Sequence, residues 1–298
     1  MRFTSKTEDK KTLLDLLIEK TGASATKART LIKNSAVFVD GRPALRPDLL
    51  VRPGQSVEVT GKKDRKAKRA PSATVLYEDK FIIAAQKPAG VLSISTKAES
   101  INTFYRAVSA YVKDNSAGKD KIFIVHRLDR EVSGVMLFAK DQDAKKALQD
   151  SWEKTEKIYN ALVEGRPPED EDTITGWLCE AGENLVYSCA APAPDEKGKG
   201  SGARLAVTHY KLIKENRRFS LLEVRIETGR KHQIRVHLSD IGCPVVGDRK
   251  YGVGGKGPIE RMGLHASSLS FTHPVTGRRM TIESPMPKSF LRPFKTQT

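Results

Sequence analysis

The stretch from Gly61 to Pro71 constrains the fold most, because it cannot belong to a packed core. It reads Gly-Lys-Lys-Asp-Arg-Lys-Ala-Lys-Arg-Ala-Pro, with six basic residues, one acid and no apolar periodicity. This composition is typical of a flexible linker, which either contacts phosphates or only keeps the chain in solution. The 298 residues suffice for one large domain with its own core and a small companion. We therefore predict a small domain at 1–60, a basic linker at 61–72 and a larger domain at 73–298.

Two helices followed by a hairpin are predicted in the small domain. The first helix has apolar residues on one side from Leu13 to Ile18, and Gly22 is a stop signal. Ser24 can cap a second helix, of which one face is apolar and the other basic. The pair Asp40-Gly41 then predicts a two-residue hairpin turn, because both positions tolerate positive φ. The basic side chains of the second helix are Lys27, Arg29 and Lys33.

The charge of the chain restricts its partners. Its 52 Lys and Arg outnumber its 36 Asp and Glu, which gives a formal net charge of +16 at pH 7. A positive field of this kind attracts polyanions, so nucleic acid or an anionic membrane fits, and an unspecialised basic protein is the alternative. The start of the chain does not resemble a signal peptide, and no run of about 18 apolar residues occurs. We therefore expect a cytoplasmic protein with no membrane partner.

Cysteine and histidine spacing predicts neither a disulfide framework nor a metal site. The three cysteines, Cys179, Cys189 and Cys243, are widely spaced, odd in number and lack a Cys-x-x-Cys pair. A reducing compartment fits this pattern. His232 and His237 are five residues apart with no acid between them, which is not a metal-ligand spacing. We expect no metal ion, and no Gly-x-x-x-x-Gly-Lys-Ser/Thr loop indicates a nucleotide triphosphate.

The larger domain is predicted to mix helices and strands. Strand and turn signals alternate from Val75 to Gly90, and an amphipathic helix is expected around Ile101–Tyr111. Strand-like runs follow at Ile122–Val125 and Val135–Phe138, and helical spacing returns at Ala144–Trp152. Because strict βαβ repetition is missing, we predict an α+β domain with a mainly antiparallel sheet.

Three segments of this domain carry residues suited to chemistry. The loop His126–Gly134 places the carboxylate of Asp129 among arginines, where an ionised aspartate is favoured. The segment Thr228–Leu238 is predicted to be a helix that presents basic residues to an anion or to Asp129. The strand Lys157–Gly165 offers the phenol of Tyr159. Each signal alone is commonly structural, but together and in this order they indicate an active site. The basic residues of the predicted helix are Arg230, Lys231, Arg235 and His237.

These segments together resemble the RluA family of RNA pseudouridine synthases. That family's signature reads His-Arg-Leu-Asp-Arg, two variable positions and Ser-Gly, and the resemblance runs from about Val75 to Phe290. It implies a pseudouridine synthase fold, a mainly antiparallel mixed sheet flanked by helices, and isomerisation of uridine in RNA without a cofactor. The further matching segments are Gln86–Gly90, Lys157–Ala161, Gly229–Arg235, Gly247-Asp248 with Tyr251, Leu264–Ala266 and Phe271–Pro274.

The resemblance implies three catalytic residues. Asp129 would attack the flipped-out uridine or its ribose, so that the glycosidic bond breaks and the uracil rotates before its carbon 5 joins the sugar. Tyr159 would lie against the base and help to remove the proton from carbon 5. Arg235 would pair with Asp129 and keep it charged.

It also implies residues that contact the substrate. Leu264 would form an apolar wall, and Arg127 would fill the gap that the flipped base leaves in the RNA stack. Arg230 and His126 complete the expected set.

The small domain resembles the S-four RNA-binding domain. The matching stretches are Ser24–Lys33, Val37–Gly41 and Leu49–Val59. In that family the basic helix and the hairpin contact structured RNA, so Lys27, Arg29 and Lys33 are the expected RNA-binding residues. A solvated basic helix face is the alternative.

The expected partner is RNA. We expect ribosomal RNA before transfer RNA, because ribosome-directed relatives carry a similar appended module, and no obligate protein partner is evident. Glu131 and Val132 depart from the residues common at the variable signature positions, the stretch after Gly90 lacks a frequent histidine, and 192–203 is expected to be an inserted loop. The alternative function is a non-catalytic RNA-binding or ribosome-assembly factor.

Overall fold

The chain divides into two compact units in the computed structural model, Met1–Arg69 and Ala70–Thr298. The described residues are 2–4, 11–33, 36–44, 46–59, 73–95, 102–182, 185–191, 202–254 and 257–295. The predicted linker at 61–72 therefore lies outside them, as does most of the inserted loop at 192–203. Within the described residues no helix has the length and apolar character needed to cross a membrane.

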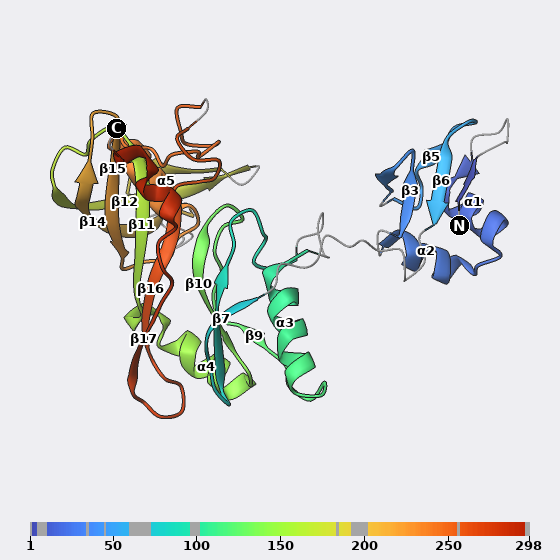
Figure 1. The fold of residues 1–298 in the computed structure, drawn as a ribbon, viewed down its shortest axis with the longest axis horizontal. Helices are drawn as coiled ribbons and strands as arrows, with labels where there is room; N and C mark the ends of the chain where they lie inside the picture. The colour runs from blue at the N-terminus through green and yellow to red at the C-terminus, as the bar shows by residue number, and fades with distance from the viewer. Residues whose placement is uncertain are drawn as a thin grey trace, which may run out of the picture. The chain divides into compact units, whose positions relative to one another are not determined.

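The N-terminal unit contains the two predicted helices (Figure 1). Helix α1 (Leu13–Thr21) begins where the Thr12 hydroxyl accepts a hydrogen bond from the Asp15 amide, and it ends at Gly22, whose φ of 63° favours glycine. Helix α2 (Ala25–Lys33) follows after a short connection. The apolar faces of both helices join one core, to which they contribute Leu13, Leu16, Leu17, Ala28 and Ile32.

The predicted hairpin is also present in this unit. Strands β3 (Val37–Val39) and β4 (Arg42–Pro43) pair antiparallel, and Asp40 and Gly41 adopt φ values of 49° and 74° between them. The four-stranded sheet has the order β1-β6-β3-β4, and β2 pairs with β5. The remaining strands are β1 (Arg2–Thr4), β2 (Lys11–Thr12), β5 (Leu50–Val51) and β6 (Ser56–Val59).

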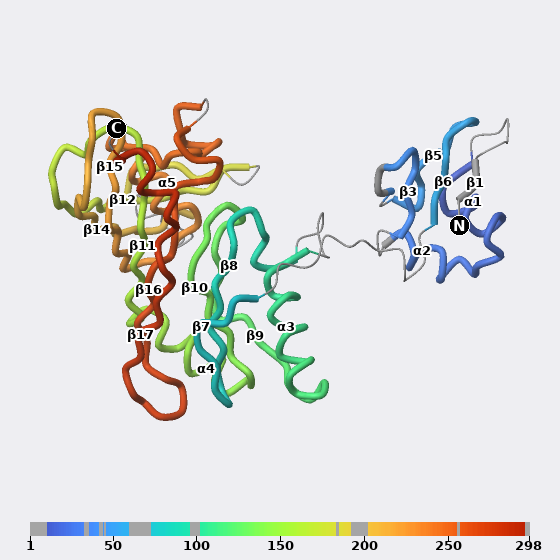
Figure 2. Tube along the Cα trace, viewed as in Figure 1, coloured from blue at the N-terminus to red at the C-terminus, as the bar shows by residue number. Residues whose placement is uncertain are grey.

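The larger unit is built on an 11-stranded sheet (Figures 1 and 2). Its order is β13-β12-β14-β15-β11-β16-β10-β8-β7, with β17 beside β16 and β9 beside β10. Among the described ladders of this sheet, only β10 with β16 is parallel, so the mainly antiparallel mixed sheet is confirmed. The strands are β7 (Thr74–Glu78), β8 (Ile82–Lys87), β9 (Phe123–Ile124), β10 (Ser133–Ala139), β11 (Glu156–Glu164), β12 (Glu171–Ala181), β13 (Leu185–Cys189), β14 (Arg204–Glu215), β15 (Phe219–Ile226), β16 (Leu264–Thr272) and β17 (Arg279–Glu283).

Helices cover both faces of this sheet. Alternate residues of β10 point to opposite sides, with Met136 and Phe138 in one core and Val135 and Leu137 in the other. Helix α3 packs into the first core, together with α5, and helix α4 packs into the second. The remaining helices are α3 (Phe104–Asn115), α4 (Gln142–Asp150), α5 (Gln233–Asp240) and the 3-10 turns η1 (Trp152–Lys154) and η3 (Lys288–Phe294).

Gly134 explains why the signature ends in Ser-Gly. It has a φ of 121°, and it pairs with Ala266 where β10 meets β16. A Cβ atom added at this glycine would lie 2.1 Å from the carbonyl oxygen of Ala266. The parallel pairing therefore requires glycine, and it places the loop 125–132 beside the start of β16.

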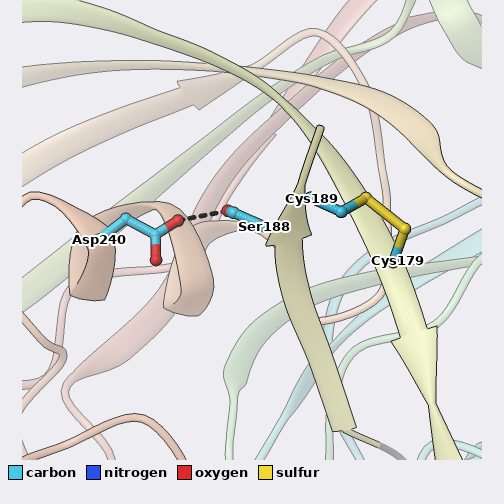
Figure 3. The surroundings of a disulfide bond; sticks show 4 residues. All are labelled: Cys179, Ser188, Cys189 and Asp240. Carbon is cyan, nitrogen blue, oxygen red and sulfur yellow. Dashed lines mark hydrogen bonds between the residues drawn. A yellow bond between two sulfur atoms is a disulfide. The ribbon is translucent and has the colours of Figure 1, made fainter. Parts of the chain in front are cut away.

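One disulfide bond corrects the prediction from cysteine spacing. Cys179 on β12 and Cys189 on β13 are joined, with their Cα atoms 6.0 Å apart (Figure 3). The prediction was wrong because it counted separation along the chain, whereas the hairpin brings residues 10 apart onto neighbouring strands. The residue before Cys189 on β13 contacts α5, through a hydrogen bond from the Ser188 hydroxyl to Asp240 (Figure 3). Cys243 is buried and free.

Candidate active site

One guanidinium holds two carboxylates at the centre of the site. Arg235 on α5 donates from Nη1 to Asp129 Oδ2 at 2.9 Å. On its other side it donates to both oxygens of Asp248, at 2.6 Å from Nε and 2.9 Å from Nη2. The Asp248 side chain is fully buried, whereas that of Asp129 is 31% exposed. Hydrogen bonds to the buried Asp248 thus fix the Arg235 side chain, and its third hydrogen bond orients the partly exposed carboxylate of Asp129.

Charge and burial act in opposite directions on this cluster. Burial alone would lower the pKa of Arg235, but the hydrogen bonds and charges of Asp248 and Asp129 raise it overall. Burial likewise opposes ionisation of Asp248, but the bonds from Arg235 and from two backbone amides lower its pKa. Arg235 and Asp248 are therefore charged at neutral pH, and the hydrogen bonds to Asp248 and Asp129 keep Arg235 in one orientation.

His232 is a member of the site that the sequence analysis considered only as a metal ligand. It has a φ of 56°, directly before α5, and its Nε2 lies 3.8 Å from Asp129 Oδ2. Its Nδ1 is 2.8 Å from the hydroxyl of Tyr251, which accepts a hydrogen bond from the Val186 amide at 3.0 Å. Burial lowers the pKa of His232 to about 4, so the ring is neutral at pH 7. The motif Gly229–Arg235 contains His232 and was the signal that could have identified it.

A cavity of about 150 Å³ opens in front of Asp129. Tyr159 and Leu264 form part of its wall, so the predicted carboxylate, phenol and apolar wall face the same space. Burial raises the pKa of Tyr159, and the charge of Asp129 adds to this effect, so its phenol is protonated at neutral pH. The cavity thus combines one carboxyl group with a neutral aromatic surface. Its lining also includes Arg127, Ile226 and Arg230.

Not every predicted residue faces this cavity. His126 lines the neighbouring cavity, where its Nε2 accepts a hydrogen bond from the Leu137 amide at 3.0 Å and its ring stacks on Trp152. Burial lowers the pKa of His126 to about 3, so it is a neutral support of the signature loop. His237 was expected to face an anion or Asp129, but its Nδ1 lies 3.0 Å from the Thr208 hydroxyl inside the protein.

The start of α5 also differs from the prediction. The helix begins at Gln233, so Arg230 and Lys231 lie in the preceding turn and not on the helix. Gln233 closes this turn, because its Oε1 accepts hydrogen bonds from the Arg230 amide and the Thr228 hydroxyl. Arg230 then donates from Nε to the Leu205 carbonyl at 3.0 Å. These local bonds, which helical periodicity does not predict, fix the turn beside the cavity.

Lys87 anchors the loop that carries Asp129. Its side chain is fully buried, and Nζ donates to the carbonyl oxygens of Pro88 and Arg130 at 3.0 Å each and of Val132 at 2.7 Å. The Gly90 amide also donates to the Arg130 carbonyl. The segment Gln86–Gly90 therefore holds the loop that carries Asp129 in place through these hydrogen bonds, a role that the sequence patterns did not predict.

Replacement of Lys87 by methionine is expected to change how stability depends on pH. Burial lowers the pKa of Lys87 from 10.5 to about 7, whereas the unfolded chain keeps the higher value. Between these values the unfolded chain binds more protons, so the free energy of unfolding should rise with pH in the unaltered protein relative to Lys87→Met. Denaturant unfolding across this window measures the difference, with Lys113→Met as an exposed control. A constant difference would mean that Lys87 stays charged in the folded protein.

In the parts of the chain that the structure describes, no group of three His, Cys, Asp or Glu side chains is arranged as a metal site would require.

Comparisons with known proteins agree with this geometry. The sequence profile of a family described as RNA pseudouridylate synthase matches residues 81–240. The uncharacterized RNA pseudouridine synthase YhcT of Bacillus subtilis (strain 168) is 33% identical over 217 residues, which cover 72% of this chain and 68% of the relative. The ribosomal large subunit pseudouridine synthase D of Pseudomonas aeruginosa is 32% identical over 281 residues, covering 87% of this chain and 83% of the relative.

The solved structure of human RNA pseudouridylate synthase domain containing 4 has a TM-score of 0.61 and 24% identity, over 74% of this chain and 90% of that chain. This likeness concerns the fold, and it confirms the fold class predicted from the sequence.

Proposed function

Because this chain belongs to the RNA pseudouridylate synthase family, we propose that it isomerises uridines of large-subunit ribosomal RNA with Asp129 as its catalytic carboxylate. The enzyme is an RNA pseudouridine synthase, and the proposal concerns its substrate and its site. The contact of Arg235 with Asp129 at the mouth of an aromatic and apolar cavity carries the assignment of the site. The relative of Pseudomonas aeruginosa, named for the large ribosomal subunit, supports the choice of RNA.

The proposed reaction conserves all atoms of the substrate. The Asp129 carboxylate attacks the uracil or its ribose, the bond between N1 and the sugar breaks, and the freed uracil rotates. A bond then forms between carbon 5 and the sugar while the bond to Asp129 breaks and its carboxylate is released, carbon 5 loses its proton and N1 gains one. Arg235 orients the Asp129 carboxylate for the attack, and no redox partner is needed.

The walls of the cavity would hold the uracil during its rotation. Leu264 is an apolar surface, and the protonated phenol of Tyr159 can lie against the ring. That phenol already carries its proton. Tyr159 can therefore assist removal of the carbon 5 proton only by passing a proton on to another acceptor, and Asp129, which lines the same cavity, is such an acceptor. Arg127 is exposed at the cavity mouth, where a planar cation could replace the flipped base in the RNA stack.

Pseudouridine mapping in a strain that lacks the protein tests the choice of RNA. We expect one or more pseudouridines to disappear from large-subunit ribosomal RNA and to return when the gene is restored. Loss confined to transfer RNA would refute ribosomal RNA as the substrate while leaving the isomerase activity in place. We also propose a cytoplasmic location. The thiols of this reducing compartment would act on the Cys179–Cys189 disulfide bond.

The N-terminal unit is proposed to bind RNA through α2. Lys27 and Arg29 are exposed on this helix, whose first turn has no acid, while the side chain of Lys33 lies outside the described residues. The double variant Lys27→Ala/Arg29→Ala is expected to weaken RNA binding and to reduce the slope of log affinity against log salt by about 2, since each phosphate contact contributes about 1. Lys20→Ala is the control, because that ammonium is paired with Glu19 at 2.9 Å. An unchanged slope would refute this role.

A further inference from the structure

A second cavity, of about 260 Å³, adjoins the first and shares part of its lining. On β11, Tyr159 lines both cavities and Lys157, two residues earlier, lines only the second. On β16, Leu264 lines the first and Ala266 the second. The two cavities therefore meet at Tyr159, where a β-bulge between Ile158 and Tyr159 interrupts the pairing of β11 with β16. Arg127, which is exposed, lines both of them.

Lys157 is a buried cation that forms no ion pair with the described residues, although the charge of Glu153 acts on it from a greater distance. Only 5% of the residue is exposed, and Nζ donates to the Thr155 carbonyl at 2.7 Å. Nζ also lies 5.8 Å from the centre of the Trp152 ring. No carboxylate of the described residues forms an ion pair with it, whereas the ammonium of Lys140, also largely buried, is paired with Glu78. Burying an unpaired charge is unfavourable, so an anion from another molecule that binds beside Lys157 would stabilise its charged form.

The substrate supplies such an anion. Every nucleotide beside the flipped uridine brings one phosphodiester, and the second cavity begins at the wall of the first. An ammonium has three N–H donors, of which the Thr155 carbonyl takes one in Lys157. The remaining donors and the neighbouring guanidinium of Arg127 match the oxygens of a phosphate.

We propose that the second cavity is an RNA subsite in which Lys157 binds the phosphodiester next to the target uridine. The proposal rests on the isomerase function, because it requires RNA to occupy the first cavity. It also explains why a buried cation is kept at this position: Lys157 opposes folding of the free protein and favours the complex with RNA. Burial lowers the pKa of Lys157 in the free protein by more than the charge of Glu153 raises it, which agrees with this proposal.

Lys157→Met is the decisive variant, because methionine keeps most of the apolar stem and removes the charge. We expect its free energy of unfolding to equal or exceed that of the unaltered protein. We expect its RNA affinity to fall about 10-fold or more, the typical effect of losing one charge-assisted hydrogen bond, and its salt slope to fall by about 1. Lys154→Met is the matched control, since Lys154 is exposed on η1 and lines neither cavity. Equal affinity and slope in Lys157→Met and the unaltered protein would overturn the subsite.

A chemical change in the RNA tests the same contact from the other side. The probe is a synthetic hairpin that contains the target uridine found by mapping, with each flanking phosphodiester replaced in turn by a neutral methylphosphonate. One replacement is expected to weaken binding of the unaltered enzyme and to have little further effect in Lys157→Met, as a double-mutant cycle requires. If no flanking linkage is sensitive in the unaltered enzyme, the subsite is refuted even where Lys157→Met fails to fold.

Product formation on the unmodified hairpin separates this proposal from the proposed function. An enzyme that makes pseudouridine and is indifferent to Lys157 and to every methylphosphonate refutes the subsite alone. An enzyme that makes no pseudouridine in any RNA refutes the function and the subsite together.

Discussion

The Asp129→Asn variant is expected to bind RNA with nearly unaltered affinity and to form no detectable pseudouridine. Asparagine keeps the size of the side chain and one carbonyl oxygen for Arg235 Nη1, so the cavity should keep its shape. The amide is not a nucleophile, and loss of a covalent catalyst lowers rates by roughly 10⁴-fold or more. Binding should not weaken, because the change removes a negative charge from a surface that faces phosphates.

Chromatography of digested RNA measures the product of Asp129→Asn, and filter binding measures its affinity. Asp143→Asn is the control, since Asp143 is exposed on α4 and lines none of the cavities described for the site. It should retain full activity. Product from Asp129→Asn at the rate of this control would remove Asp129 from the mechanism. It would also revive the interpretation of the signature as part of an RNA-binding surface.

Arg235→Leu is expected to lower the free energy of unfolding by about 3–5 kcal/mol and to abolish product. Leucine leaves the fully buried carboxylate of Asp248 without its cation, and an unpaired buried charge is strongly destabilising. It also leaves Asp129 without the guanidinium that orients it. Denaturant unfolding and product assays on the same preparation measure the two losses.

The double variant Arg235→Leu/Asp248→Asn separates stability from catalysis. Asparagine at 248 removes the unpaired charge and still offers an oxygen to the amides of Lys250 and Tyr251. Most of the lost stability should therefore return, while the activity should not, because Asp129 remains without Arg235. Recovery of activity together with stability would mean that Arg235 serves only the fold.

Local patterns predicted elements whose signals lie within a few residues of one another. The stop of α1 at Gly22 and the turn at Asp40-Gly41 follow from positive φ values that glycine and aspartate tolerate. The amphipathic spacing over Ile101–Tyr111 predicted α3, although the first turn of the helix is set by the Thr103 cap. The predicted start of α5 was wrong. The side chain of Gln233 bonds to the preceding turn, and this contact, which helical spacing does not show, sets where the helix begins.

The sequence patterns did not predict three long-range contacts, and the physical reason is the same for each. The support of the signature loop by Lys87 joins residues 43 and 45 apart, and the approach of His232 to Asp129 depends on the fold of β16 and α5. The disulfide depends on the register of β12 with β13. Periodicity and spacing describe neighbours along the chain, so they carry no information about such pairings.

By itself the sequence determined that this is an α+β chain with an RNA-directed signature, because its short motifs and turn residues act through local chemistry. It also singled out Asp129, Tyr159 and Arg235 through a family resemblance. Only the tertiary structure decided which cation holds Asp129 and what faces the substrate. Arg235 lies 106 residues further along the chain, and it reaches Asp129 because α5 packs on β13 and β14, which belong to the same sheet as β10, and because Asp248 fixes the guanidinium on its buried side.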